Sequence, residues 1–284
     1  MTIDAEKLQA WVGKREEQQQ IIPAWPVGAW EAMLDYDRPA PQDGDPLPPG
    51  AHWIFFNPAA RQSGLGEDGH PQRGGFLPPV ELPRRMWAGG RLSFPRPLRI
   101  GEVVTKQSEI LSVKVKEGRT GPLIFVTVKH SLSGSAGIAI VEEHDIVYRG
   151  WPTEAEKAKQ PPAAPPVEDA AWSREVVPTP PLLFRYSALT FNGHRIHYDH
   201  PYVTQVEGYP GLIVHGPLMA TLLLDLVRRE KPDATLTSFS FRGMSPVFDT
   251  APFWVNGKPV DGGAELWIAG PGNYLGMQAE AKFA

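Results

Sequence analysis

The stretch Gly211–Pro232, GLIVHGPLMATLLLDLVRREKP, decides how the chain folds. Apolar residues recur at helical spacing from Leu218 to Val227, and Pro232 ends the run. These residues fill more than one narrow stripe, so we predict a well-buried helix rather than one that lies on a surface. We expect a β-sheet to wrap around this helix.

Segments with β-branched residues and alternating polarity predict that sheet on both sides of the helix. Before it, residues 102–116, 121–132 and 137–149 are separated by the turn sequences EGRTG and SGSAG. After it, TLTSFSFRG, APFWVNGKPV, AELWIAG and LGMQAEAKF follow one another, with NGK and GPGN as turns. Each half of the chain therefore offers several long antiparallel strands, which indicates an α+β fold.

The remaining segments set the organisation of the chain. We predict helices at Asp4–Gln20, at 25–37 and in RYSALTF, and an irregular stretch at 56–90. A long irregular stretch often lies over a functional cleft, although it can also be coil packed on a sheet. Residues 151–181 are rich in proline and alanine, which is typical of a semi-rigid spacer. We therefore divide the chain into a first half, 1–150, a linker, 151–181, and a second half, 182–284.

Composition excludes several classes of protein. The 284 residues are 42% hydrophobic and 21% charged, as in ordinary globular proteins, and can form one or two domains. A net charge of −4 gives no reason to expect nucleic acid, and no apolar run is long enough to span a membrane. Cysteine is absent, which excludes disulfides, thiolate metal sites and a cysteine nucleophile. The N-terminus lacks the pattern of a signal peptide, and we expect a cytoplasmic protein.

Three of the eight histidines lie in LTFNGHRIHYDHPY, residues 189–202, at His194, His197 and His200. One interpretation is a metal site, with three imidazoles and the carboxylate of Asp199 as ligands. The turn-forming sequence and Pro201 make such spacing weakly specific. A surface loop is another, and acid–base catalysis is the third, because the ordinary pKa of histidine suits proton transfer at neutral pH.

The sequence GLIVHGPL strengthens the acid–base interpretation. Glycine just before a long buried helix allows a ligand to approach the open amides of the helix start closely. Those amides and the positive end of the helix can hold a negative oxygen. A base opposite such a site is suited to chemistry through an enolate, such as proton movement next to a thioester carbonyl. The simpler alternative is a helix whose entry needs glycine only for packing.

At this point the run YSALTFNGHRIHYDHPYV, followed by EGYPGLIVHGPLMATLLLDL, resembles the hydratase motif of the MaoC-like (R)-specific hydratases and dehydratases. It is most similar to the mitochondrial-type 3-hydroxyacyl-thioester dehydratases and to the mesaconyl-C4-CoA and itaconyl-CoA hydratases. The segment GGFLPPVELPRRMWAGGRL is similar to the same branch. The resemblance covers residues 25–284 and is strongest at 184–226.

This resemblance implies a double hotdog, in which each half is a curved antiparallel sheet around a helix. Its first half would be degenerate and would shape the tunnel for the acyl–pantetheine arm. The resemblance places the catalytic histidine at His197 and the amide that polarises the thioester carbonyl at Gly216. Asn192 stands where the wider superfamily has a catalytic acid, so we expect it to orient water while His197 transfers protons.

The resemblance also implies the surroundings of the site and its chemistry. We expect His194, Arg195 and His215 to contact or support the substrate, with Thr221 as a weaker candidate. The reaction would add water to an enoyl thioester or remove it, with no metal and no cofactor beyond the coenzyme A of the substrate. We expect an acyl-CoA as the partner, no nucleic acid or membrane, and a homo-oligomer.

Several alternatives stay open. The acyl group can be a short branched dicarboxylate on coenzyme A, such as mesaconyl or itaconyl, or a fatty acyl chain on coenzyme A or acyl carrier protein. A dicarboxylate needs a cation in the site, and the candidates are Arg84, Arg85, Arg91 and Arg195. With Asn192 in place of the acid, a non-catalytic acyl-CoA binding protein is a further alternative, and a thioesterase is a weaker one.

Overall fold

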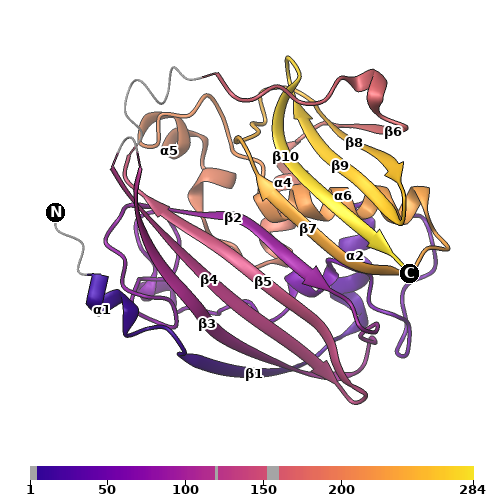
Figure 1. Cartoon of the computed structure of the whole chain (residues 1–284), viewed down its shortest axis with the longest axis horizontal. Coiled ribbons are helices and arrows are strands. Elements are labelled where there is room, and N and C mark those ends of the chain that lie inside the picture. The colour runs from indigo at the N-terminus through magenta and orange to yellow at the C-terminus, as the bar shows by residue number, and fades with distance from the viewer. Residues whose placement is uncertain (1–4, 119–120, 152–159) are drawn as a thin grey trace.

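The structure, a computed structural model, describes residues 5–118, 121–151 and 160–284. Within them, ten strands form one antiparallel sheet in the order β1-β3-β4-β5-β2-β7-β10-β9-β8-β6 (Figure 1). The strands are β1 Arg15–Ile21, β2 Arg84–Ser93, β3 Val103–Gly118, β4 Gly121–Gly134, β5 Gly137–Arg149, β6 Trp172–Val176, β7 Leu236–Gly243, β8 Phe253–Val260, β9 Gly263–Gly270 and β10 Tyr274–Phe283. The helices are α1 Ala5–Gln9, α2 Ala24–Met33, α4 Pro180–Leu189, α5 His200–Gln205 and α6 Gly216–Glu230, with short 3-10 turns η1 Ala51–Ile54, η2 Gln62–Gly64, η3 Val167–Asp169 and η4 Arg195–His197.

The two halves of the sheet repeat one strand order. From its outer edge inward, the first half has the order β1, β3, β4, β5, β2. From the opposite edge inward, the second half has the corresponding order β6, β8, β9, β10, β7, and the two inner strands, β2 and β7, pair with each other. This joint is tight: a Cβ atom on Gly89 would lie 2.5 Å from the carbonyl oxygen of Phe241, and one on Gly90 would lie 2.9 Å from its ring. Glycine at these two positions therefore lets the halves join into one sheet.

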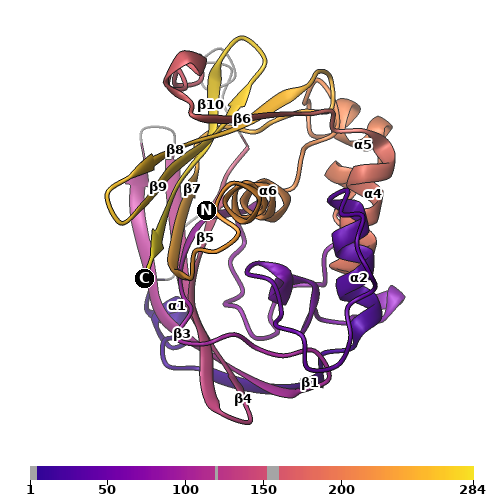
Figure 2. The ribbon, with the colours of Figure 1, turned by 90° about the vertical axis from the view of Figure 1, so that its right-hand side faces the viewer.

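Helix α6 lies inside the curve of the second half, as the sequence predicts (Figure 2). Its apolar residues, including Leu218, Leu222 and Leu226, are buried in the main core, and the helix packs on β8, β9 and β10. The buried carboxylate of Asp225 accepts hydrogen bonds from Arg174 of β6, at 2.6 Å, and from Arg229, at 2.9 Å. The helix is thus held to the edge strand of the sheet by charge as well as by packing.

The first half has a different interior. Helix α2 packs against α4 and η1, and the inner side of β3, β4 and β5 is covered by a second apolar cluster that includes Val80 and Leu82. These two residues belong to the stretch 56–90, which is irregular up to β2. Coil therefore covers this part of the inner side, while buried residues of α2 such as Trp30 belong to the main core together with Val104 of β3.

The prediction of a helix at Asp4–Gln20 is wrong for its larger part. Helix α1 ends at Gln9, Gly13 adopts a φ of +82°, and β1 then pairs antiparallel with β3, from Arg15 opposite Glu109 to Ile21 opposite Val103. Glutamate and glutamine favour helices, but here hydrogen bonds to the sheet edge override that weak preference. Asp4, expected to cap the helix, lies outside the described residues.

The other elements agree with the sequence in part. The strands predicted at 102–116, 121–132 and 137–149 are confirmed as β3, β4 and β5. Strand β2 begins at Arg84, which lies in the stretch predicted to be irregular, and β6 lies inside the predicted linker and pairs with β8. Residues 152–159 of the linker lie outside the described part of the chain.

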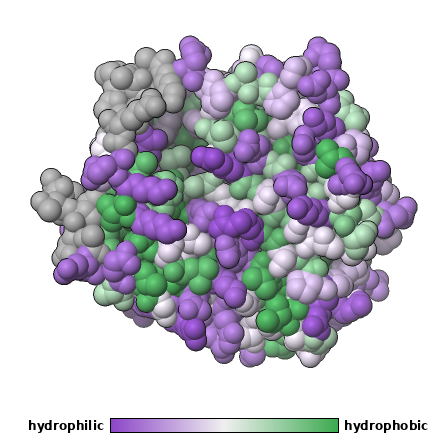
Figure 3. All heavy atoms as spheres, viewed as in Figure 1, coloured by the Kyte–Doolittle hydropathy of each residue, from purple (hydrophilic) through white to green (hydrophobic). Residues whose placement is uncertain are grey.

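The face of the molecule that shows the outer side of the sheet is of mixed polarity (Figure 3). Hydrophilic side chains cross its middle. On β2, Arg91 pairs with Glu143 at 2.8 Å and with Asp145 at 2.6 Å. Among the described residues, no helix has the length and apolar character needed to cross a membrane.

Candidate active site

His197 ends the short turn η4 and is 7% exposed. Its Nδ1 lies 2.7 Å from the carbonyl oxygen of Ile213, and the backbone N–H of Ile213 donates to the carbonyl of Ile196 at 3.0 Å. Since a carbonyl can only accept, Nδ1 carries the proton and Nε2 keeps its lone pair. Burial lowers the pKa of His197 to about 4, partly offset by the Ile213 carbonyl, so at neutral pH the ring is a neutral base.

His215 ties this base to the start of α6. Its ring stacks on that of His197, with centroids 3.6 Å apart and an interplanar angle of 18°. It is fully buried, and its Nε2 lies 2.8 Å from the hydroxyl oxygen of Ser187, which α4 places there. Burial, followed by the neighbouring His197 and His194, holds the pKa of His215 well below its usual range. A neutral His215 therefore supports His197 and fixes it beside the helix start.

Gly216 follows His215 directly and is the first residue of α6. A Cβ atom built on Gly216 would meet nothing within 4 Å beyond its chain neighbours and the backbone of its own helix, although the nearby residues His215 and Leu218 are fully buried. There is thus room for a ligand at the backbone of Gly216. The first N–H groups of a helix have no partner within the helix, and its positive end favours a developing negative charge.

The loop before η4 brings Asn192 and His194 to the same place. The side-chain oxygen of Asn192 accepts from the backbone N–H of His194 at 3.0 Å, and the ring of His194 lies edge-on to that of His197, with centroids 5.5 Å apart. Burial, then His70 and His197, holds the pKa of His194 well below its usual range. The amide of Asn192 thus shapes the loop with its oxygen, and its NH₂ group remains as a donor for water.

The site also includes Asp68 and His70, which sequence reasoning missed. The N–H of Arg195 donates to the carbonyl of Asp68 at 2.9 Å, and Arg195 Nη1 donates to the carbonyl of Glu67 at 3.0 Å. The ring centroids of His70 and His194 are 3.9 Å apart, and His70 Nδ1 lies 3.0 Å from Asp68 Oδ2, within hydrogen-bond distance. The sequence DGH in the irregular stretch was the only local signal.

The residues of the alternative metal interpretation, His194, His197, His200 and Asp199, do not form one cluster. His200 is exposed at the start of α5, and Asp199 instead accepts from Tyr202 N–H at 3.1 Å and pairs with Arg195 at 2.8 Å. Another set, Asp68, His70 and His194, has potential ligand atoms within 4.8 Å of one another.

The geometry of this set does not fit a tetrahedral metal. Two imidazoles on one zinc ion, with Zn–N bonds of about 2.0–2.1 Å, have ring centres about 5 Å apart. The centroids of His70 and His194 are 3.9 Å apart, and the nitrogen of His70 is already bonded to Asp68. The three side chains therefore form a group held by the hydrogen bond to Asp68 and by the tilted contact of the two rings.

The four candidate arginines differ in their partners. Arg84 lies 3.8 Å from Glu207, and the carboxylates of Glu143 and Asp145 bind Arg91 on the outer side of the sheet. Asp199 pairs with Arg195.

Arg85 is different. It stands opposite Tyr148 on β5 and interacts with that hydroxyl, and no carboxylate of the described residues pairs with it. Its charge contributes to lowering the pKa of both His194 and His144, so the guanidinium is within electrostatic range of the active site and of the interior of the first half. Arg85 is thus the candidate cation for a substrate carboxylate.

The interior of the first half is polar beyond Arg85. Glu142 is 3% exposed, accepts from Trp53 Nε1 at 3.0 Å and lies 3.3 Å from His52 Nε2. Although burial opposes ionisation, the hydrogen bond with His52 holds the pKa of Glu142 well below its usual range. His144 packs on Trp87, and burial lowers its pKa to about 4. This interior is unsuited to a long hydrocarbon chain.

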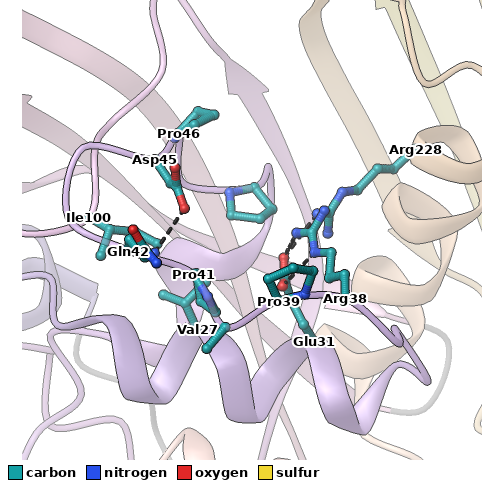
Figure 4. A pocket seen from close by; sticks show the side chains of 12 residues that line it. Val27, Glu31, Arg38, Pro39, Pro41, Gln42, Asp45, Pro46, Ile100 and Arg228 are labelled. Carbon is teal, nitrogen blue, oxygen red and sulfur yellow. Dashed lines mark hydrogen bonds and ion pairs between the residues drawn. The ribbon is translucent and has the colours of Figure 1, made fainter.

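A separate pocket of about 420 Å³ lies at the other end of α6 (Figure 4). Arg228 on its wall is about 18 Å along the helix from Gly216, at a rise of about 1.5 Å per residue. The carboxylate of Glu31, which also lines the pocket, accepts hydrogen bonds from Arg38 at 2.8 Å and from Arg228 at 2.9 Å. These charges are paired with each other, so the pocket offers no group for the chemistry described above.

Comparisons with known proteins agree with this geometry. The family model of hydroxyacyl-thioester dehydratase type 2 matches residues 50–249. A mesaconyl-C(4)-CoA hydratase of Chloroflexus aurantiacus is 47% identical over 273 residues, which are 96% of each chain. Among solved structures, a MaoC-like dehydratase of Phytophthora capsici has a TM-score of 0.68 at 13% identity and covers 99% of both chains. A Mycobacterium tuberculosis protein described as a double hotdog has a TM-score of 0.57 at 13% identity and covers 96% of both.

Two sheet halves of equal strand order and the likeness to a double hotdog show the fold, and the family match and the hydratase relative show that the chain is a hydro-lyase. The predicted α+β double hotdog is confirmed. Within that class, the chain belongs to the hydroxyacyl-thioester dehydratase type 2 family.

Proposed function

We propose that the chain hydrates a short, branched, dicarboxylic enoyl-CoA of the mesaconyl-C4-CoA type, with His197 as the base. The supporting observation is the stack of His197 on His215, the residue that directly precedes the open backbone of Gly216 at the start of α6. In hydration, Nε2 takes a proton from water while the water oxygen bonds to the β-carbon. The negative charge that develops on the thioester oxygen is held by the N–H of Gly216. Coenzyme A enters with the substrate, and the residues of the site need no other cofactor for these steps.

Two observations support the dicarboxylic acyl group over a fatty acyl chain. The relative from Chloroflexus aurantiacus is named for mesaconyl-C4-CoA, whose acyl group carries a free carboxylate. Arg85 offers a cation close to His194 with no carboxylate partner in the described structure, and the interior beyond it is polar. A panel of mesaconyl-, crotonyl- and longer enoyl-CoA thioesters tests this proposal, with loss of the absorbance of the conjugated double bond as the readout. Preference for long chains, release of free thiol, or binding without turnover would each contradict it.

Replacing Arg85 by glutamine should weaken recognition of the carboxylate. A hydrogen bond to a charged group contributes about 1.5–3 kcal/mol, so we expect kcat/KM for mesaconyl-C4-CoA to fall by about 10- to 100-fold. Crotonyl-CoA, which lacks the carboxylate, should be affected by less than about threefold. Arg91→Gln is the matched control because its side chain lies on the outer side of the sheet. Equal losses for both substrates would show that Arg85 only supports the fold.

Asn192 offers a test of the loop. Asn192→Ala removes the acceptor of the His194 N–H, and loss of a hydrogen bond of about 1 kcal/mol, together with the lost donor to water, should reduce kcat about tenfold. Asn192→Asp keeps an acceptor at the same position and adds a carboxylate, so it should retain activity within about tenfold of the wild type. An inactive aspartate variant with normal thermal stability would show that the NH₂ group, rather than the oxygen, is the essential part.

A further inference from the structure

In the family pattern a catalytic acid and His197 would both transfer protons, but in this chain the position of the acid is occupied by Asn192. An acid at position 192 would be a second group beside His197, but Asn192 cannot exchange a proton, and its oxygen is bonded to the N–H of His194. Adding water to a double bond requires one proton to leave the water and one to reach the α-carbon. His197 can perform the first of these steps, and the structure must supply a group for the second.

Asp68 and His70 lie directly against the loop that carries His194 and His197. The segment 67–70 is bonded to the catalytic loop through the two hydrogen bonds from Arg195. At Gly69, with a φ of +84°, the backbone approaches Gly193 so closely that a Cβ atom would overlap its carbonyl oxygen. The contact is therefore a close backbone-to-backbone fit between the first and second halves, at the residue that follows Asn192.

Four imidazoles form one continuous group at this place: His70 lies on His194, His194 lies edge-on to His197, and His197 stacks on His215. Their positive charges would repel one another, so the group as a whole holds few protons at a time. Of these four histidines, His70 is the one that is hydrogen-bonded to a carboxylate of the described residues. Of the four rings, it is thus the one on which a proton is best stabilised.

The tautomer of His70 is also fixed. Asp68 is an acceptor for Nδ1–H, and although burial opposes its ionisation, the hydrogen bond with His70 holds the pKa of Asp68 well below its usual range. Burial lowers the pKa of His70, and the bond to Asp68 partly offsets this. The ring therefore directs its Nδ1 proton to Asp68 and leaves Nε2 as the nitrogen that can gain and lose a proton.

We propose that Asp68 and His70 form the second acid–base pair of the hydratase site and take the part of the acid that Asn192 replaces. In hydration, His197 Nε2 removes a proton from water as the C–O bond forms at the β-carbon. The electron pair of the double bond moves toward the α-carbon and the thioester oxygen, and the proton on His70 Nε2 passes to the α-carbon. His70 regains a proton from solution and His197 returns one to it, so water is added with no net change in the enzyme. This inference rests on the proposed hydratase function.

Two substitutions of His70 separate catalysis from support of the loop. His70→Asn places an amide N–H close to the position of Nδ1, so the bond to Asp68 can form, but Nε2 is lost. His70→Gln keeps a nitrogen near Nε2 but cannot act as an acid or base. Loss of general acid–base catalysis is worth about 10²- to 10⁴-fold, and we expect both variants to lose kcat in that range, with KM within about threefold. His200→Gln is the matched control, an exposed histidine of the same region.

The decisive measurement is exchange of the α-protons of a saturated acyl-CoA, such as succinyl-CoA, in D₂O, followed by NMR. This exchange needs the group that serves the α-carbon but no addition of water. We expect His70→Asn to abolish exchange and His197→Asn to retain it, with Asp68→Asn reducing both exchange and turnover. Full activity of His70→Asn, or exchange lost only in the His197 variant, would overturn the proposal. If the wild type hydrates none of the thioesters in the panel, the proposed function itself fails, which is a different outcome.

Discussion

Replacing His197 by asparagine is expected to lower kcat for hydration by about 10²- to 10⁴-fold, the usual contribution of a positioned acid–base group. The asparagine NH₂ can still donate to the carbonyl of Ile213, which Nδ1 contacts at 2.7 Å in the wild type, so the turn η4 keeps its hydrogen bond. What is lost is Nε2, whose lone pair accepts the proton of water. Because burial lowers the pKa of His197 to about 4, this lone pair is free at neutral pH in the wild type.

Initial rates with an enoyl-CoA, measured from the absorbance of the conjugated double bond, give the answer directly. Thermal unfolding of the variant should stay within a few degrees of the wild type, since the stack on His215 loses one ring but the backbone contacts remain. A variant within a few-fold of wild-type kcat would remove His197 from the mechanism.

Replacing Gly69 by alanine is expected to lower kcat by on the order of 10²-fold, although the side chain touches no substrate. A Cβ atom there would overlap the carbonyl oxygen of Gly193, and it would lie 2.9 Å from the carbonyl carbon. Neither backbone can yield without moving either His70 or the loop that carries His194. A displacement of about 1 Å in a catalytic arrangement can cost about 10²-fold in rate.

The positive φ of Gly69 adds strain of its own, and the chain offers a control for it. Gly262, in the turn between β8 and β9, has a φ of +67° and no atom within 4 Å of a Cβ position. Gly262→Ala should therefore lose some stability to backbone strain but keep its activity. If thermal unfolding and turnover change by the same amounts in both variants, the contact between Gly69 and Gly193 is not required for catalysis.

The sequence predicted the residues of the site that lie close together along the chain. His197 and Gly216 belong to two local patterns, a turn with spaced histidines and a helix that begins after glycine, and the structure brings them together through the stack on His215. Asp68 and His70 could not be predicted in this way, because they lie more than a hundred residues earlier in a stretch with no periodicity. Only the tertiary contact between Gly69 and Gly193 reveals them.

The strands likewise divide into those that a local sequence pattern predicts and those that depend on distant partners. The long strands β3, β4 and β5 alternate clearly and pair with near neighbours, so their sequence predicts them. Strands β1, β2 and β6 are defined by the partners they meet: β1 is rich in glutamine and glutamate, β2 contains two glycines, and β6 has only five residues. The roles of the individual site residues, the division into halves and linker, the homo-oligomer, the cytoplasmic location and the lack of a further cofactor stay predictions.

The joint at Gly89 and Gly90 makes two similar halves into one sheet, and the contact of Gly69 with Gly193 crosses between those halves. Exchange of segments between related genes is consequently constrained. A hybrid that takes its second half from another member of the family receives a new catalytic loop but keeps the old Asp68 and His70. Its recovery of activity would depend on whether residues 66–70 and 192–195 were inherited from the same parent, so these two short segments should vary together when relatives diverge.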